Sequence, residues 1–186
     1  EESYIEFILA DGTSIIVERN PVFENEIQLR QAIAKGGTVI LTGDVALSSP
    51  LNITTDVILK LGNYNITNPT DYVIENTGNL TIEADSGTIV GLGGIRSRGG
   101  SVTINGGTVS AASNWSTGTF HHIIKAENTE VVINGGIFDA NVGGTNNAML
   151  NASTGSVITI NGGVFRNVPD GEQIPMFAPY LFTYEN

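Results

Sequence analysis

Apolar and polar residues alternate in three segments of the chain that each end in the phrase Ile-Asn-Gly-Gly. Their apolar positions are two residues apart, at Val102 and Ile104, Val131 and Ile133, and Ile158 and Ile160. A period of two predicts β-strands with one buried face. The Asn-Gly-Gly that follows favours a bend, because glycine accepts positive φ and asparagine tolerates the left-handed region. Each copy is therefore predicted to be a strand followed by a tight bend.

The copies repeat at a nearly constant spacing. Ile104, Ile133 and Ile160 occupy the same position in successive copies, and a weaker copy has Ile82 in that position. Two earlier segments have similar apolar spacing, "DVILKLGNYNIT" and "GTVILTGDVALS". A period of roughly 20 to 30 residues that tolerates insertions is typical of a solenoid.

Each repeat contains three short strands and no helix. One strand precedes the bend, a second follows it, and a third lies upstream in "DYVIEN", "GIRS", "HHIIKAE" and "NAMLNA". Because equivalent strands run in the same chain direction, stacking each on its own copy gives parallel sheets around an apolar core. The expected fold is all-β, a right-handed parallel β-helix (solenoid) of about five or six coils over residues 38–168. Antiparallel pairing through Asn-Gly hairpin turns is the local alternative, and the regular period argues against it.

Stacking would also bring the asparagines of the bends together. Asn105, Asn134 and Asn161 are expected to form a side-chain ladder, and a structural role for them is favoured over a functional one. Such ladders occupy equivalent positions in consecutive coils of a repeat protein.

The N-terminal residues are expected to protect the open strand edges of the solenoid. Residues 1–20 alternate as a β-hairpin that turns at Asp11-Gly12. Residues 21–37 are expected to form a capping helix that starts at Asn25 and stops at Gly36-Gly37. The apolar residues expected on the face of this helix that covers the first coil are Ile27, Leu29, Ala32 and Ile33.

Residues 169–186 break the repeat. They contain prolines and an apolar, mostly aromatic cluster of Phe177, Tyr180, Leu181, Phe182 and Tyr184. We expect a C-terminal cap or tail here, with a subunit contact or a lead into a further domain as the alternative.

The segment "AIAKGGTVILTGDVALSSPLNITTDVILKLGNYNIT" is similar to the entry coils of the pectate-lyase-like right-handed parallel β-helix superfamily. In those proteins a helix leads into a Gly-Gly turn and a first strand. The resemblance covers residues 25–168 and implies the fold, but the superfamily includes pectate lyases, polygalacturonases, phage tailspikes and bacterial surface proteins. With its short coils and simple repeats, the chain most resembles non-enzymatic phage-virion or bacterial surface β-helices. Homotrimers are common among the phage proteins, so a homotrimer is one assembly that the resemblance suggests.

The composition of the chain limits the kinds of molecule that it is expected to bind. The 186 residues carry 8 basic and 19 acidic side chains, a formal net charge of −11, which disfavours nucleic acid and anionic membranes. There is no Cys, and no apolar run approaches the roughly 20 residues of a membrane-spanning helix. The chain opens at Glu1 without Met, a basic segment or an apolar leader, as expected of a processed or excised piece.

No catalytic or metal-binding motif stands out in the sequence. The Asp residues are scattered, and the only histidines are His121 and His122, for which no third ligand is evident. A glycosidase needs two carboxyl groups across a cleft, and a calcium-dependent lyase needs converging carboxylates and a basic group. An enzyme would require carboxylates such as Glu75, Glu127 or Asp139 to converge with Arg96 or Lys125. No catalytic residue, metal or cofactor is predicted.

One face is a candidate for ligand binding. If Ile74, Ile95, Ile124 and Leu150 point inward, the next residue of each points outward, one per coil. Those outward residues are Glu75, Arg96, Lys125 and Asn151. Trp115, the only Trp, lies in the adjoining loop, where an exposed ring suits stacking on a sugar. The competing interpretation is a solvated charge ladder, with Trp115 holding its own loop in place.

These observations predict a non-catalytic module on a cell or virion surface. It would serve as a fibre or spacer, or as an adhesin that binds a polysaccharide or cell-surface glycan on this face. The alternative is a polysaccharide lyase or glycoside hydrolase acting on the same face.

Overall fold

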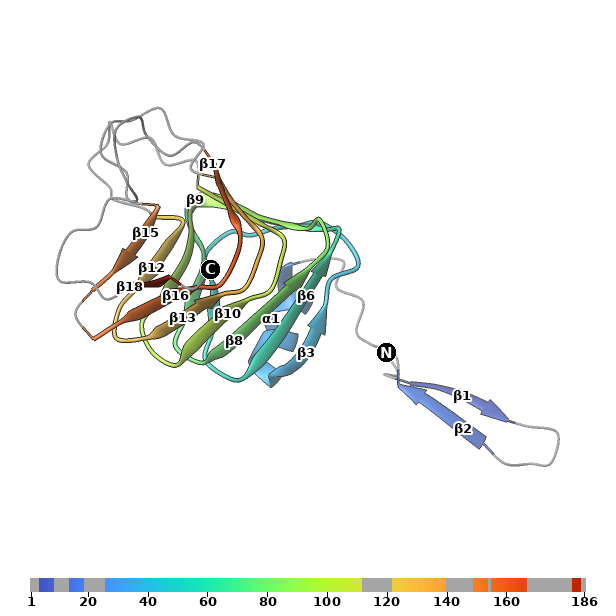
Figure 1. Ribbon diagram of the computed structural model, residues 1–186. Helices are drawn as coiled ribbons and strands as arrows, with labels where there is room; N and C mark the ends of the chain where they lie inside the picture. The colour runs from blue at the N-terminus through green and yellow to red at the C-terminus, as the bar shows by residue number, and fades with distance from the viewer. Residues whose placement is uncertain are drawn as a thin grey trace.

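The chain folds as a parallel β-solenoid of about five turns, preceded by one helix and a β-hairpin (Figure 1). The computed structural model describes residues 4–8, 14–18, 26–111, 122–139, 149–153, 155–166 and 182–184. The all-β parallel architecture predicted from the repeats is confirmed.

A seven-stranded parallel sheet forms one wall of the solenoid. In spatial order its strands are β18 (Phe182–Tyr184), β16 (Val157–Ile160), β13 (Glu130–Ile133), β10 (Ser101–Ile104), β8 (Asn79–Ala84), β6 (Val57–Gly62) and β3 (Gly37–Ile40). Ile82, Ile104, Ile133 and Ile160 pair laterally in one register. The four isoleucines that occupy the same position of the sequence repeat therefore lie next to one another on neighbouring strands.

A nine-stranded sheet forms the other walls. Its strands are β4 (Val45–Ala46), β5 (Leu51–Ile53), β7 (Asn65–Asn76), β9 (Thr88–Ser97), β11 (Thr108–Ala111), β12 (Ile124–Ala126), β14 (Ile137–Asp139), β15 (Leu150–Ala152) and β17 (Val164–Arg166). The first half of β9 pairs with β11 and its second half pairs with β12. In β7 and β9, therefore, the second and third strands expected in each coil are one continuous strand.

The core is a set of aliphatic columns that run through the coils. Ile74, Ile95, Ile124 and Leu150 are at most 1% exposed, and pair in successive strands. Because inward and outward residues alternate along each strand, the residue after each of these faces the opposite side. Burial of each such aliphatic side chain contributes about 1.5–3 kcal/mol.

The asparagine ladder expected at the bends is present. Asn134 Nδ2 donates to Asn105 Oδ1, and Asn161 Nδ2 donates to Asn134 Oδ1, both at 2.9 Å. Gly107 and Gly136 have φ of 82° and 108°. A Cβ on Gly107 would lie 2.7 Å from the Ala84 Cβ, so both conformation and close stacking require glycine at this bend.

Helix α1 (Glu26–Lys35) covers the first coil, as predicted. Leu29, Ala32 and Ile33 are buried, but Ile27 is 68% exposed. The expectation that Ile27 shares the buried face was wrong, because at 3.6 residues per turn it lies roughly opposite Leu29. The helix ends where predicted, at Gly36 and Gly37, whose φ angles are 76° and 82°.

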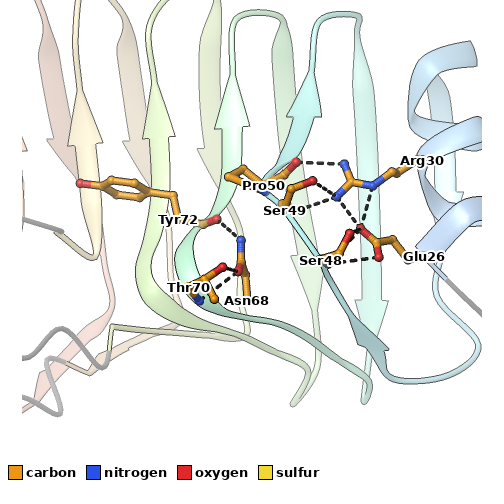
Figure 2. Close-up of polar contacts among 8 residues, drawn as sticks. All are labelled: Glu26, Arg30, Ser48, Ser49, Pro50, Asn68, Thr70 and Tyr72. Carbon is orange, nitrogen blue, oxygen red and sulfur yellow. Dashed lines mark hydrogen bonds and ion pairs between the residues drawn. The ribbon is translucent and has the colours of Figure 1, made fainter.

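Polar contacts fasten the start of the helix to the first coil (Figure 2). The Glu26 carboxylate accepts from the Ser48 backbone N–H at 3.0 Å and pairs with Arg30 at 2.6 Å. Arg30 in turn donates to the backbone oxygens of Ser49 and Pro50 at 2.5 and 2.9 Å. The capping helix is therefore held both by its apolar face and by this polar clamp.

The hairpin predicted for residues 1–20 is present as β1 (Tyr4–Ile8) and β2 (Ser14–Glu18), paired antiparallel. Its Asp11-Gly12 turn lies outside the described residues, as do Asn25 and most of residues 169–186. None of the helices in the described part of the chain has the length and apolar character that crossing a bilayer demands.

Candidate ligand-binding face

The structure places four of the five predicted site residues in one lateral row. Glu75 pairs in register with Arg96, Arg96 with Lys125, and Lys125 with Asn151, on β7, β9, β12 and β15. Their inward neighbours are buried as expected. Trp115, the fifth residue, lies outside the described residues, together with His121.

A second outward row lies beside the first, where β9 and β12 end. It contributes Arg98 and Glu127, which sequence reasoning did not select as binding residues. Arg98 Nε lies 3.8 Å from Glu75 and 3.3 Å from Glu127. We use the name charged face for the outward residues of the two rows: Glu75, Arg96, Arg98, Lys125, Glu127 and Asn151.

The carboxylates of the charged face are engaged by its cations. Arg96 forms an ion pair with Glu75. Lys125 Nζ lies 2.8 Å from Glu127. Three of the eight basic residues of this acidic chain thus meet two carboxylates on one wall of the solenoid. The side chains are partly shielded, with exposed fractions from 14% for Glu75 to 50% for Arg98.

This pairing decides the protonation of the face. Burial alone would raise the pKa of Glu127, but the hydrogen bond and charge of Lys125, with Arg98 and Arg96, outweigh it and lower that pKa below its ordinary value. Burial alone would lower the pKa of Arg96, yet the hydrogen bond and charge of Glu75 raise it overall. Both groups are therefore held in their charged forms.

An aromatic side chain supports the charged face from below. Tyr72 is 1% exposed, and the Arg96 guanidinium carbon lies 5.0 Å from the centre of its ring. At that distance the cation is attracted to the ring face. Burial, the largest influence, raises the pKa of Tyr72 to about 12, so the hydroxyl stays protonated. The Tyr72 ring therefore fixes the position of Arg96 without adding a charge.

The corner that carries Tyr72 is built by local polar contacts. Asn68 is fully buried, and its Nδ2 donates to the Tyr72 carbonyl at 2.8 Å, while its Oδ1 accepts from Thr70 (Figure 2). These bonds satisfy backbone groups at the point where β7 changes direction. The sequence offered one signal of this corner, the Asn-Pro-Thr that interrupts an otherwise strand-like run.

The arrangement does not resemble an acid–base pair. A general acid at neutral pH needs a carboxyl with a raised pKa, whereas the pKa of Glu127 is lowered. Asp139, also considered for an enzyme, lies on β14 in register with Ser110 and Arg166, in a different part of the sheet. Among the described residues, no group of three or more His, Cys, Asp or Glu side chains is placed to hold a metal ion.

Comparison of the chain with protein-family models, curated proteins and solved structures gives no significant match.

Proposed function

We propose that this chain is a non-catalytic β-solenoid module of a cell or virion surface, whose charged face binds glycan. The observation that carries the proposal is the row of Glu75, Arg96, Lys125 and Asn151, which presents donors and acceptors at the regular spacing of successive strands. Neighbouring strands are about 4.8 Å apart, so the row offers an extended ligand one polar side chain at each strand.

The donors of the face support binding rather than a purely structural ladder. Arg98 and Lys125 are half and about a quarter exposed, so their remaining N–H groups are open to a ligand. A ligand hydroxyl or carboxylate would accept hydrogen bonds from these exposed N–H groups of Arg98 and Lys125.

The non-catalytic part of the proposal is supported by the ionisation of the face. Glycan hydrolysis requires a protonated carboxyl as general acid, and an arginine could serve as the base of an elimination only with its guanidine unprotonated. The lowered pKa of Glu127 and the raised pKa of Arg96 oppose both roles. The enzyme alternative therefore finds no general acid in Glu127 and no general base in Arg96.

A glycan array and a polysaccharide-depolymerisation assay on the purified chain test the proposal. Lys125→Ala and Trp115→Ala should each weaken glycan binding at least about tenfold, the loss expected for one charge-assisted contact or one ring contact. Lys60→Ala is the matched control, because Lys60 forms a comparable ion pair with Glu83 at 3.0 Å on the other sheet. Binding should survive in that control.

Three results would count against the proposal. Depolymerisation that Lys125→Ala or Arg96→Ala abolishes would establish the enzyme alternative. Equal loss of binding in Lys60→Ala and Lys125→Ala would place the site elsewhere. Absence of binding across the array would leave a rigid spacer as the function.

A further inference from the structure

We propose that Asn105 is a site of spontaneous deamidation, and that the asparagine ladder protects Asn134 from the same reaction. The three Asn-Gly pairs of the chain all stand in the bends, within the identical phrase Ile-Asn-Gly-Gly. A following glycine leaves its backbone nitrogen unhindered for attack on the asparagine side chain. Since the local sequence is the same, any difference in rate between the three sites must come from the fold.

The reaction is balanced within the chain and water. The Gly106 backbone nitrogen attacks Asn105 Cγ, a new N–C bond forms, and the side-chain amide nitrogen leaves as ammonia with the proton from Gly106. The resulting succinimide then takes up one water. It opens to aspartate or to isoaspartate. In isoaspartate the peptide bond to Gly106 is made by the former side-chain carbonyl group.

The ladder restrains the three side chains unequally. The Asn134 amide is held on both sides, because it donates to Asn105 and accepts from Asn161. Asn105 and Asn161 stand at the two ends, and each has one ladder bond. Deamidation requires the side-chain amide to leave its hydrogen bonds, so the middle residue should react most slowly.

The backbone distinguishes the two ends. The Gly162 N–H donates to the Ile133 carbonyl at 3.3 Å. The backbone nitrogen that would attack the Asn161 side chain is therefore engaged in a hydrogen bond. Gly106 instead lines an open depression of about 340 Å³, together with Asp85, Ser86 and Gly107. Asn105 itself is exposed. Asn105 therefore combines a loosely held amide with a solvent-accessible glycine.

The product would alter the solenoid locally. Asn105 follows Ile104, which pairs with Ile82, so its lateral neighbour in the preceding coil is Glu83. A carboxylate at position 105 would face Glu83 and add a negative charge to a chain already at −11. Isoaspartate would also lengthen the backbone of the bend, where a Cβ on Gly106 would already lie 2.5 Å from the Ala84 carbonyl oxygen.

Peptide mapping by mass spectrometry tests the proposal. The intact chain is aged at mildly alkaline pH, folded and in denaturant, and the exchange of NH₂ for OH is followed at each of the three sites. In denaturant the three rates should agree, because the phrase is the same. In the folded chain Asn105 should react fastest and Asn134 about tenfold more slowly than Asn105. A folded rate at Asn105 no greater than at Asn134 would overturn the assignment.

The variant Asn161→Ala separates the ladder from general burial. Loss of its bond should accelerate deamidation at Asn134 and leave the rate at Asn105 unchanged, with circular dichroism showing an intact fold. An unchanged rate at Asn134 would overturn the protective role of the ladder. Acceleration at both remaining sites, Asn105 as well as Asn134, would do the same, because it would show a loosened fold rather than a lost contact.

Discussion

The Tyr72 hydroxyl accepts a hydrogen bond from the backbone N–H of His122 at 3.0 Å, across 50 residues of sequence. Tyr72 lies on β7 and His122 just precedes β12, so the side chain spans the intervening strand β9 and joins three coils. The His122 N–H is buried with its residue, which is 8% exposed. This contact lies beside the charged face and fixes the position of its strands.

Replacement of Tyr72 by Phe should destabilise the fold. The ring would remain, but the buried His122 N–H would lose its hydrogen bond to the Tyr72 hydroxyl, at a cost of about 1–3 kcal/mol. Chemical denaturation measures the change in free energy of unfolding. Tyr64→Phe is the matched control, because Tyr64 is 38% exposed and should change stability little. Equal changes in the free energy of unfolding for the two variants would show that the hydrogen bond to His122 makes no net contribution to stability.

Replacement of Gly93 by Ala should destabilise the same corner. A Cβ on Gly93 would lie 2.5 Å from Tyr72 Cδ1, and the buried ring has no room to move away. Overpacking of this kind costs about 1–3 kcal/mol. Gly99→Ala is the control, because a Cβ there would meet only the Thr77 carbonyl oxygen, at 3.7 Å. A lower thermal midpoint is expected for Gly93→Ala alone.

The asparagine ladder predicts unequal effects of single substitutions. Asn134→Ala removes two ladder bonds, whereas Asn105→Ala removes one. Since these bonds are exposed, each should contribute near the lower limit of about 0.5 kcal/mol. The loss of unfolding free energy for Asn134→Ala should therefore be about twice that for Asn105→Ala. Equal losses would mean that the ladder bonds are replaced by water without cost.

The clamp at the start of α1 predicts a pH dependence. The hydrogen bond from Arg30, followed by those from Ser48, lowers the pKa of Glu26 from 4.5. Because the folded pKa is below the unfolded one, the stabilisation is complete above about pH 4.5 and is lost as pH falls through the folded pKa.

Glu26→Gln should therefore lower stability near neutral pH, and its stability curve should converge with that of the natural chain in acid. The measurement is the free energy of unfolding across the acidic range. Glu130→Gln, at an exposed carboxyl on β13, should parallel the natural chain. Curves for Glu26→Gln and the natural chain that stay parallel into acid would contradict the assignment.

Local chemistry determined most of the fold. Alternation at Val102 and Ile104 selects a strand, and the glycines of the Asn-Gly-Gly phrase select the bend, because these preferences act within a few residues. Repetition then determines the stack, so the parallel sheets and the row of Glu75, Arg96 and Lys125 could be predicted by counting. Ile27 was misplaced although the 3.6-residue period of a helix already puts it roughly opposite Leu29, so this error lay in the interpretation and not in missing tertiary information.

Only the tertiary structure showed which side chains of neighbouring coils contact one another outside the repeated Ile-Asn-Gly-Gly strands. Arg98 and Glu127 join the charged face, and Tyr72 meets Gly93 and His122, only because coils of unequal length come into a particular lateral register. The backbone preferences of single residues cannot specify a contact between residues 50 positions apart. Such contacts are selected when the side chains of successive coils pack against one another. The sequence by itself therefore determined the repeating unit and the first row of the charged face, and packing between units determined the ion pairs of Arg98 and Glu127 and the support from Tyr72.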